Sequence, residues 1–397
     1  MCSSDLKLNW GTRACAVLVL CATTAIALPA QIATLTTIHR FCSQSGCPDG
    51  ANPSAGLVQA TNGDLYGTTD SGGTGNGGTI FKIAPGGTLT TLYSFCSQTN
   101  CTDGFYPYGG LVQAANGDLY GTTYFGGTNG QGTVFKITQG GTLTTLYSFC
   151  SQTNCTDGDG PYAGLVQAAN GDLYGTTNGG GTNGLGTVFK ITPGGTLTTL
   201  YSFCSQSGCT DGAVPDAGLV QAANGNFYGT TYYGGTNKRG TVFKITPGGT
   251  LTTLYSFCSQ TNCTDGADPT AGLVQATNGD LYGTAQEGGA NGYGTVFKIA
   301  AGGTLTTLYS FCSQSGCTDG ASPHAGLVQA TNGDHYGTTT SGGANGPGTG
   351  TVFRITPSGT LTTLYSFCSQ SLVHRRRRPL RGAGPGHGWG LLWDSFG

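Results

Sequence analysis

Short apolar stretches with strand character recur along the chain at a constant interval. The segment Gly-Leu-Val-Gln-Ala begins at Gly56 and returns every 54 residues, so that six copies are present. In the second unit, four runs rich in Val, Thr, Tyr, Phe and Ile span residues 110–114, 118–123, 132–138 and 142–149. β-Branched and aromatic residues favour strands, and each unit is therefore predicted to contain four of them.

Turn residues between the runs predict how these strands pair. Asn116-Gly117 separates the first two runs, and this dipeptide favours a type I′ turn in which both central residues have positive φ. Gln139-Gly140-Gly141, which is Pro-Gly-Gly in several other units, joins the third and fourth runs and indicates a second hairpin. Residues 124–130 form a longer Gly/Asn loop between the two middle runs. Each unit is predicted to be a four-stranded antiparallel meander.

One such sheet cannot cover both of its own faces, whereas a ring of sheets packs face to face. We therefore predict an all-β protein, a β-propeller of four-stranded antiparallel blades with six complete blades in residues 31–371. A β-solenoid is the alternative, because Gly-Gly-Thr-Asn-Gly is similar to Gly-rich calcium-binding repeats. Those repeats have a much shorter period and a recurrent Asp within the Gly-rich run, and neither feature is present here.

The N-terminal sequence differs from the repeat. Residues 1–30 are predicted to be a signal peptide, because Lys7 and Arg13 precede an apolar run, residues 14–28, that ends in small residues. This run is short for a membrane span, so we expect a secreted or cell-surface protein with no membrane span after cleavage. Residues 33–41 have the pattern of a fourth strand and precede the first complete unit.

The C-terminal sequence abandons the repeat after Ser371. Residues 372–397 contain four consecutive arginines, at 375–378. Codons chosen for this stretch and read one nucleotide later can spell Trp-Cys-Thr-Asp-Gly and then Gly-Leu-Val-Gln-Ala, which is the start of a further unit. We therefore interpret residues 372–397 as an out-of-frame tail, in which a single-nucleotide frameshift has removed a seventh blade. In an intact parent, residues 33–41 would close the ring by pairing with that blade.

Sixteen cysteines are consistent with export. Apart from three in residues 1–30 and the single Cys368, they occur in pairs with the spacing Cys-x4-Cys, which predicts one local disulfide per unit. A zinc site would need two more ligands near every pair, and no His recurs with the repeat, so we expect no metal. The predicted disulfides are Cys42–Cys47, Cys96–Cys101, Cys150–Cys155, Cys204–Cys209, Cys258–Cys263 and Cys312–Cys317.

Charged residues make up only 9% of the chain. Without the five Arg and one Asp of residues 372–397, and without Lys7, Arg13 and Asp5, residues 31–371 carry a net charge of −7. This mildly acidic body argues against nucleic acid as a partner. The five His do not recur with the repeat and form no Ser/His/Asp or His-metal pattern, so we expect no enzyme and no cofactor.

Charges that do recur have structural explanations. An Asp in each Asp-Gly turn, such as Asp211, is expected to accept hydrogen bonds from its local backbone. A mid-strand Lys or Arg, such as Lys190, is expected to meet a nearby Asp. One carboxylate per loop is far fewer than the six to eight oxygen ligands that Ca²⁺ takes.

Strand parity places the loops on two faces. In a meander the two hairpins open on one face, and the central loop and the linker to the next blade open on the other. The hairpins hardly vary between units, whereas the linker and central loop differ in every unit. The aromatic residues among these variable positions are our candidate ligand-binding residues: Tyr106, Tyr108, Tyr124, Phe125, Tyr162, Tyr232, Tyr233 and Tyr293.

An aromatic, uncharged rim suits stacking on sugar rings, so glycan binding is our first functional hypothesis. The alternative is a structural or adhesive cell-surface display protein, in which the tyrosines pack on neighbouring blades. A glycan or a surface protein is then the expected partner. An enzyme is the third hypothesis, and no residue can be named for it.

Five recurring segments resemble a known family. They are Gly-Leu-Val-Gln-Ala, Asn-Gly-Asp-Leu-Tyr-Gly-Thr-Thr, Gly-Gly-Thr-Asn-Gly, Gly-Thr-Val-Phe-Lys-Ile and Gly-Thr-Leu-Thr-Thr-Leu-Tyr-Ser-Phe. Together they resemble the bacterial "choice-of-anchor tandem repeat GloVer-containing" proteins over about residues 34–371. The resemblance implies an exported or surface-displayed protein that commonly carries a C-terminal sorting anchor. Residues 372–397 contain no recognisable anchor.

Overall fold

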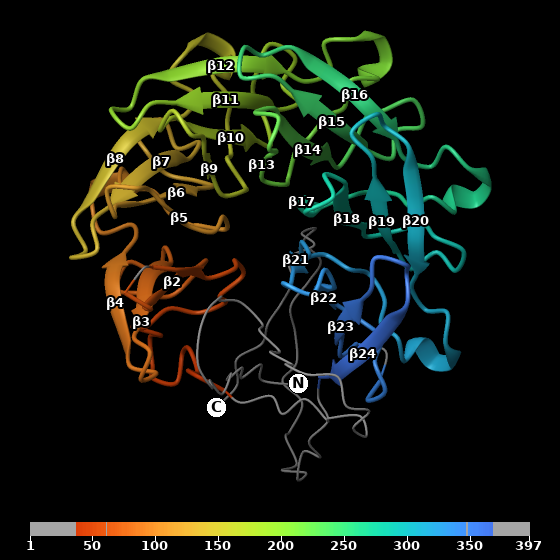
Figure 1. The fold of residues 1–397 in the computed structure, drawn as a ribbon. Coiled ribbons are helices and arrows are strands. Elements are labelled where there is room, and N and C mark those ends of the chain that lie inside the picture. Colours follow the sequence, from red (N-terminus) through yellow and green to blue (C-terminus); the bar gives the residue numbers. More distant parts are fainter. Residues whose placement is uncertain (1–36, 61, 347, 368–397) are drawn as a thin grey trace, which may run out of the picture.

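The computed structural model describes residues 37–60, 62–346 and 348–367. Within them the chain forms six four-stranded antiparallel sheets, each with its strands in sequence order. The sheets follow one another around a central axis, with the first strand of each innermost and the fourth outermost (Figure 1). This six-bladed β-propeller confirms the predicted fold class. The predicted signal peptide (1–30), residues 33–36 and the predicted out-of-frame tail (372–397) lie outside the described residues.

The four strands of every blade occupy equivalent positions in the repeat. The first strands are β1 (Val58–Gln59), β5 (Val112–Gln113), β9 (Val166–Gln167), β13 (Val220–Gln221), β17 (Val274–Gln275) and β21 (Val328–Gln329). The second strands are β2 (Leu65–Thr69), β6 (Leu119–Thr123), β10 (Leu173–Thr177), β14 (Phe227–Thr231), β18 (Leu281–Ala285) and β22 (His335–Thr339). Blades 1 to 6 are numbered in this order.

The two outer strands are as regular as the inner ones. The third strands are β3 (Thr79–Ile83), β7 (Thr133–Ile137), β11 (Thr187–Ile191), β15 (Thr241–Ile245), β19 (Thr295–Ile299) and β23 (Thr351–Ile355). The fourth strands are β4 (Leu89–Ser94), β8 (Leu143–Ser148), β12 (Leu197–Ser202), β16 (Leu251–Ser256), β20 (Leu305–Ser310) and β24 (Leu361–Ser366). Short 3-10 turns follow five of them: η1 (Thr99–Cys101), η2 (Thr153–Cys155), η3 (Ser207–Cys209), η4 (Thr261–Cys263) and η5 (Ser315–Cys317).

The first hairpin of each blade forms as predicted, but its turn type differs. In blade 2, Gly117 N donates to Ala114 O at 2.9 Å and Ala114 N donates to Asp118 O at 2.9 Å, which defines a loop of three residues. Only Gly117 has positive φ (+86°), so the type I′ turn predicted for Asn116-Gly117 is wrong. A turn followed by a left-handed glycine joins the strands instead.

A glycine within the second strand makes room for a core aromatic ring. In blade 3, Gly175 pairs with Phe189 of the neighbouring strand. A Cβ atom at Gly175 would lie 2.7 Å from Phe189 Cζ and 2.8 Å from Leu165 Cδ2. The absence of a side chain at Gly175 therefore lets the Phe189 ring lie flat across the sheet, on the face that meets the preceding blade.

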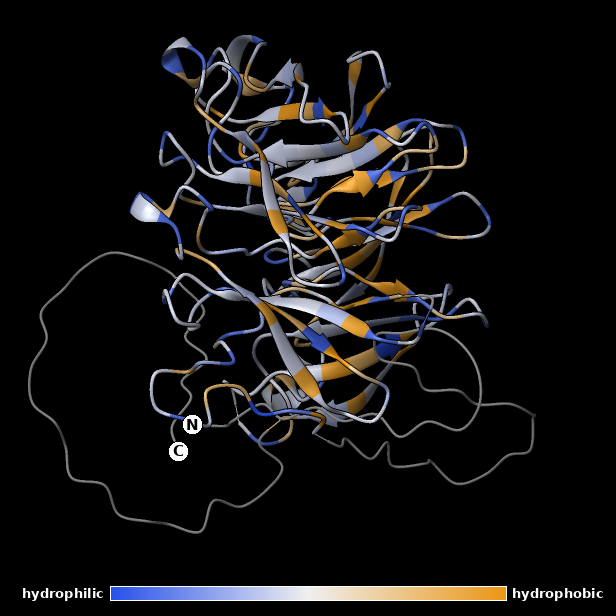
Figure 2. Cartoon of the chain, turned by 90° about the vertical axis from the view of Figure 1, so that its left-hand side faces the viewer, coloured by the Kyte–Doolittle hydropathy of each residue, from blue (hydrophilic) through white to orange (hydrophobic). Residues whose placement is uncertain are grey.

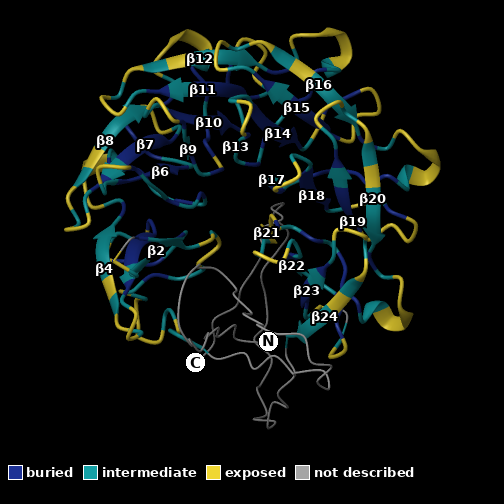
Figure 3. Ribbon diagram, viewed as in Figure 1, coloured by how far each residue is buried: buried dark blue, intermediate teal, exposed yellow. Residues whose placement is uncertain are grey.

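The hydrophobic cores lie between blades. Tyr174, Val188 and Phe203 of blade 3 form one cluster with residues of blade 4, among them Leu219 and Phe243. Four further clusters join blades 1 and 2, 2 and 3, 4 and 5, and 5 and 6. Hydrophobic residues accordingly concentrate along the strands (Figure 2), and the middle strands of the blades are buried (Figure 3). The prediction that consecutive sheets pack face to face is confirmed.

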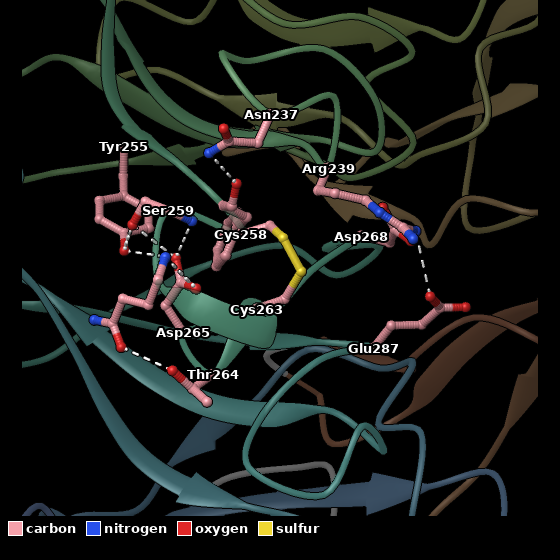
Figure 4. The surroundings of a disulfide bond; sticks show 12 residues. Asn237, Arg239, Tyr255, Cys258, Ser259, Cys263, Thr264, Asp265, Asp268 and Glu287 are labelled. Atoms are coloured by element: carbon pink, nitrogen blue, oxygen red, sulfur yellow. Dashed lines mark hydrogen bonds and ion pairs between the residues drawn. A yellow bond between two sulfur atoms is a disulfide. The ribbon is translucent and has the colours of Figure 1, made fainter.

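All six predicted disulfides are present, and the five from Cys96–Cys101 to Cys312–Cys317 each close a loop after a fourth strand. In blade 4 the loop closed by Cys258–Cys263 is fastened by Asp265, which is fully buried (Figure 4). Asp265 accepts hydrogen bonds from Tyr255 Oη at 2.7 Å and from Ser259 N at 2.8 Å. Burial, and next the hydrogen bond to the negatively charged Asp265, raise the pKa of Tyr255 to about 12.

Two predictions about recurring charges are confirmed, the second of them in five of the six blades. Each such Asp accepts from nearby backbone N–H groups, although its bond to the tyrosine of the fourth strand was not foreseen. Five of the six mid-strand cations lie near an Asp of the first hairpin, whereas in blade 4, which contains Lys244, that hairpin position is Asn226. Lys190 Nζ, for example, lies 3.8 Å from Asp172 Oδ2. The equivalent pairs are Lys82–Asp64, Lys136–Asp118, Lys298–Asp280 and Arg354–Asp334.

His335 takes the position that is Leu or Phe in the other blades, and it is fully buried. Its ring stacks on Tyr282 at a centroid distance of 4.0 Å, and neither ring nitrogen has a hydrogen-bond partner. Burial lowers the pKa of His335 below its ordinary value of 6.5. The folded state therefore disfavours the protonated ring, and stability falls as the pH drops below about 6.5.

We expect His335→Leu to raise the free energy of unfolding by about 1 kcal/mol at neutral pH, because two unsatisfied polar atoms disappear from the core. The gain should grow as the pH falls from 7 to 5. Urea denaturation of both proteins across this range tests the prediction. Burial raises the pKa of Asp216 and of Asp268 to about 6, so protonation of these two carboxyl groups favours the folded state as the pH falls. Both proteins contain the two groups, so their contribution cancels when the free energies of unfolding are subtracted. A gain that does not depend on pH would contradict the prediction.

Candidate functional site

Backbone hydrogen bonds gather the variable loops on one face of the ring. In blade 2, Phe105 N donates to Phe125 O at 2.9 Å, which ties the linker to the central loop. Across blades, Gly160 N of the blade 3 linker donates to Gln131 O of the blade 2 central loop at 2.9 Å. Linkers and central loops of consecutive blades therefore form a continuous surface, called the loop face below.

Five of the eight candidate aromatic residues come together on this face. With Phe105 they form a group of six rings, which we call the aromatic cluster: Phe105, Tyr106, Tyr108, Tyr124, Phe125 and Tyr162. The centroids of contacting rings are 4.4 to 6.3 Å apart. Tyr162, from the blade 3 linker, lies 5.0 Å from Tyr108 and 5.8 Å from Tyr124, both of blade 2. The cluster therefore spans the boundary between the two blades.

The tyrosine hydroxyls of the cluster differ from those in the disulfide loops. No hydrogen bond from Tyr108, Tyr124 or Tyr162 Oη to a protein group is present in the described part of the chain. Tyr201, in contrast, donates to Asp211 at 2.7 Å. The side chain of Tyr162 is 38% exposed, whereas the other rings of the cluster are half-buried. The cluster thus presents ring surface and uncommitted hydroxyls together.

Carboxylates adjoin the cluster, so the rim is not uncharged as predicted. Burial raises the pKa of Tyr108 to about 12, and the negative charge of Asp70 contributes to the rise. Asp216 acts in the same direction on Tyr124 and Tyr162. The Asp216 carboxylate accepts a hydrogen bond from Asn178 Nδ2, and burial raises its pKa to about 6. The aromatic surface is therefore bordered by groups that accept hydrogen bonds.

The remaining candidates lie apart from the cluster. Tyr232 and Tyr233 of blade 4 contact each other at 4.4 Å, and Tyr293 of blade 5 is 48% exposed without a ring contact in the described residues. A shallow depression of about 250 Å³ adjoins Tyr233 and is lined also by Leu185 and Val214. Its volume is below the roughly 300–1,000 Å³ usual for small-molecule sites.

An ion-pair network occupies the loop face beside Tyr232. Arg239 of the blade 4 central loop lies 2.7 Å from Asp268 and 3.4 Å from Glu287, both of blade 5 (Figure 4). The Asp268 carboxylate is nearly buried, and burial raises its pKa to about 6 despite the adjacent guanidinium. The two partners of Arg239 link blades 4 and 5, so this part of the face is committed to packing between blades.

Among the described residues, no group of three or more His, Cys, Asp or Glu side chains is arranged to hold a metal ion. A search of the described helices finds none with the length and apolarity needed to cross a membrane.

Nearly the whole chain matches one family of repeat proteins. The model of the Gloeobacter/Verrucomicrobia repeat matches residues 27–223 and 206–393. The chain belongs to this repeat family. The resemblance to GloVer-containing proteins is therefore confirmed, and the family match covers all of residues 34–371. No curated protein matches the chain.

Solved propellers resemble the chain only remotely. Two proposed 6-phosphogluconolactonases, from Bacteroides uniformis and Bacteroides fragilis, are 17% and 18% identical, each with a TM-score of 0.48. The matches cover 82% and 79% of this chain and 86% and 83% of theirs. A puromycin-hydrolyzing peptidase of Mycobacterium tuberculosis is 11% identical and has a TM-score of 0.45. The match covers 84% of this chain and 57% of the peptidase chain. Likenesses at these scores support no inference about activity.

Proposed function

We propose that the aromatic cluster binds carbohydrate and that this member of the repeat family is an exported, non-enzymatic binding module. The observation that supports the proposal is the six-ring cluster, in which three tyrosine hydroxyls have no protein partner in the described residues and carboxylates lie alongside. The C–H faces of a sugar ring stack on aromatic rings, and its hydroxyl groups donate well to carboxylates. The depression beside Tyr233 on the same face is shallow, which suits an extended chain better than a small molecule.

Six disulfides support export, because such bonds form and persist in oxidising compartments. The variable loops support a binding role, because the scaffold is repeated almost unchanged while residues on one face are not. The repeat propeller is in itself suited to either a binding or a structural module.

A display role is the second candidate, and one observation favours it. Tyr108 and Tyr162 pack on each other across the boundary between blades 2 and 3, so they also contribute to blade packing. If they have no other role, the propeller only spaces or presents other surface components. Both roles predict that Tyr162→Ala lowers stability slightly, and only the binding role predicts an effect on a ligand.

The test is a broad glycan array probed with the full chain, followed by titration of the best glycan against variants. Tyr162→Ala is expected to weaken binding at least tenfold, which is about 1.4 kcal/mol, because it removes the most exposed ring of the cluster. Tyr162→Phe keeps the ring and removes only the hydroxyl group. It therefore distinguishes stacking on the ring from a hydrogen bond to the hydroxyl. Isothermal titration calorimetry gives the dissociation constants.

Tyr293→Ala is the matched control, because Tyr293 is an exposed tyrosine of the same face outside the cluster. It is expected to change the affinity less than twofold. If no glycan on the array binds, or if Tyr162→Ala and Tyr293→Ala have the same effect, the aromatic cluster is not a carbohydrate site.

A further inference from the structure

Each contact between consecutive blades follows one pattern. A blade's trailing face, formed for example by Tyr174, Val188 and Phe203, packs on the leading face of the next blade, formed by Leu219 and Phe243 with their neighbours. Five such cores are present in the described residues, and none of them joins blade 6 to blade 1. One trailing face and one leading face are therefore left without a neighbouring blade.

The leading face of blade 1 is covered by the N-terminal segment, in the manner of a preceding blade. Phe41 contacts Phe81 at a centroid distance of 4.8 Å, as Phe203 contacts Phe243 at 5.2 Å. His39 Nε2 lies 2.8 Å from Asp49, which reproduces the contact of each fourth-strand tyrosine with its buried Asp. Residues 39 and 41 are thus placed like the end of the fourth strand of a blade before blade 1.

No described residue beyond blade 6 covers the trailing face of that blade. Val328 is 39% exposed, and Tyr336 is 8% exposed where Tyr174 is 2%. Phe367 is half-buried, whereas its equivalents in blades 1 to 5 are fully buried. A threonine hydroxyl in each preceding blade, such as Thr176, donates to a carbonyl of the next linker, in that case Ala217 O at 3.1 Å.

We propose that the protein is built for a seventh blade, formed by its own polypeptide between blade 6 and blade 1. The strand that the sequence predicts at residues 33–41, of which His39 and Phe41 are placed as described above, would be the fourth strand of this blade. Its first three strands come from the coding sequence now translated as residues 372–397, read one nucleotide later, and from the sequence that follows. Two lines of support meet at this position. The trailing face of blade 6 has no neighbouring blade in the described residues and the leading face of blade 1 is covered only by the N-terminal segment, and codons for residues 372–397 read one nucleotide later can spell the linker and first strand of the repeat.

This inference does not depend on carbohydrate binding. A blade at this position brings the two ends of the chain into one sheet, so that the ring is closed by strand pairing between them. It also completes the loop face between blade 6 and blade 1.

The nucleotide sequence across Ser371 is the first test. The shifted frame is expected to encode Trp-Cys-Thr-Asp-Gly, then Gly-Leu-Val-Gln-Ala, and then second and third strands like those of the other units. The Cys in this reading supplies the partner of Cys368. A shifted frame without the repeat would overturn the proposal.

The second test restores the blade in the protein. Residues 372–397 of the full chain are replaced by a copy of residues 208–246, which follow Ser207 in blade 4 as the new segment would follow Ser371. The thermal midpoint is expected to rise by about 5 °C or more, because the trailing face of blade 6 becomes buried and the segment on blade 1 joins a complete sheet. Phe41→Ala should then lower the midpoint more in the extended chain than in the present one.

The matched control carries the same extension with the residues copied from Leu219, Phe243 and Ile245 changed to serine. These positions form the leading face that would meet blade 6. The control is expected to leave the midpoint of the present chain unchanged. An extension that gives no rise, or a control that gives the same rise, would overturn the proposal.

Discussion

Phe203→Ala is expected to lower the free energy of unfolding by about 4 kcal/mol, the range found when a large aromatic side chain is removed from a core. Phe203 is fully buried between blades 3 and 4, where it contacts Phe243 edge-on at a centroid distance of 5.2 Å. The substitution leaves a cavity that rigid strands on both sides cannot close. Guanidinium denaturation followed by circular dichroism measures the loss.

Thr198→Ala is the control for this measurement, because Thr198 lies on the same blade, in β12, with its side chain exposed. It is expected to change stability by about 0.5 kcal/mol or less. A loss below about 1 kcal/mol for Phe203→Ala would mean that the space between blades is not a packed core.

Asp211→Ala is expected to lower the free energy of unfolding by about 3 kcal/mol. The Asp211 carboxylate is fully buried and accepts from Tyr201 Oη at 2.7 Å, Ser205 N at 2.9 Å, Ser205 Oγ at 2.9 Å and Gln206 N at 3.2 Å. Alanine removes four hydrogen bonds to a buried carboxylate, and hydrogen bonds to a charged group contribute more than those between neutral groups. Chemical denaturation monitored by tyrosine fluorescence measures the change.

Asp172→Ala provides the comparison within the same blade. Asp172 is partly exposed, and its contact with Lys190, at 3.8 Å, is of the kind that contributes about 1 kcal/mol or less. If both substitutions cost the same, the Asp211 carboxylate does not fasten the disulfide loop in the way the hydrogen bonds indicate.

The periodic sequence predicted most of the fold. Because Gly-Leu-Val-Gln-Ala recurs at a fixed step, an error in one unit would have been visible in five others, and all four strands per unit form. The hairpin at Asn116-Gly117 shows that the local sequence did not predict the turn type. The dipeptide favours a two-residue loop, but Ala114 and Asp118 pair across three residues, so the turn type depends on strand register.

The candidate site was predicted less completely. Tyr108, Tyr124 and Tyr162 were found because their positions vary between units and lie in loops that open on the same face of the ring. Asp70 and Asp216 were missed, since they lie far apart in the chain and meet the tyrosines only when blades are arranged around the axis. Alignment of the repeats gave one usable signal: the position of Tyr108 holds Tyr162 and Asp216 in the next two units. The depth of the loop face has no such signal, because it depends on side-chain packing across blades.

The central claim is that each sheet is stabilised by its neighbours. It is tested most directly by comparing Phe203→Ala with Phe367→Ala, because both residues occupy the same place in the repeat. Phe203 is enclosed by blade 4, whereas Phe367 is half-buried on the trailing face of blade 6, where the described residues form no further blade. We predict that denaturation will show a loss at least about 2 kcal/mol larger for Phe203→Ala. Equal losses at the two positions would contradict the account, because they would mean that each sheet holds its own core.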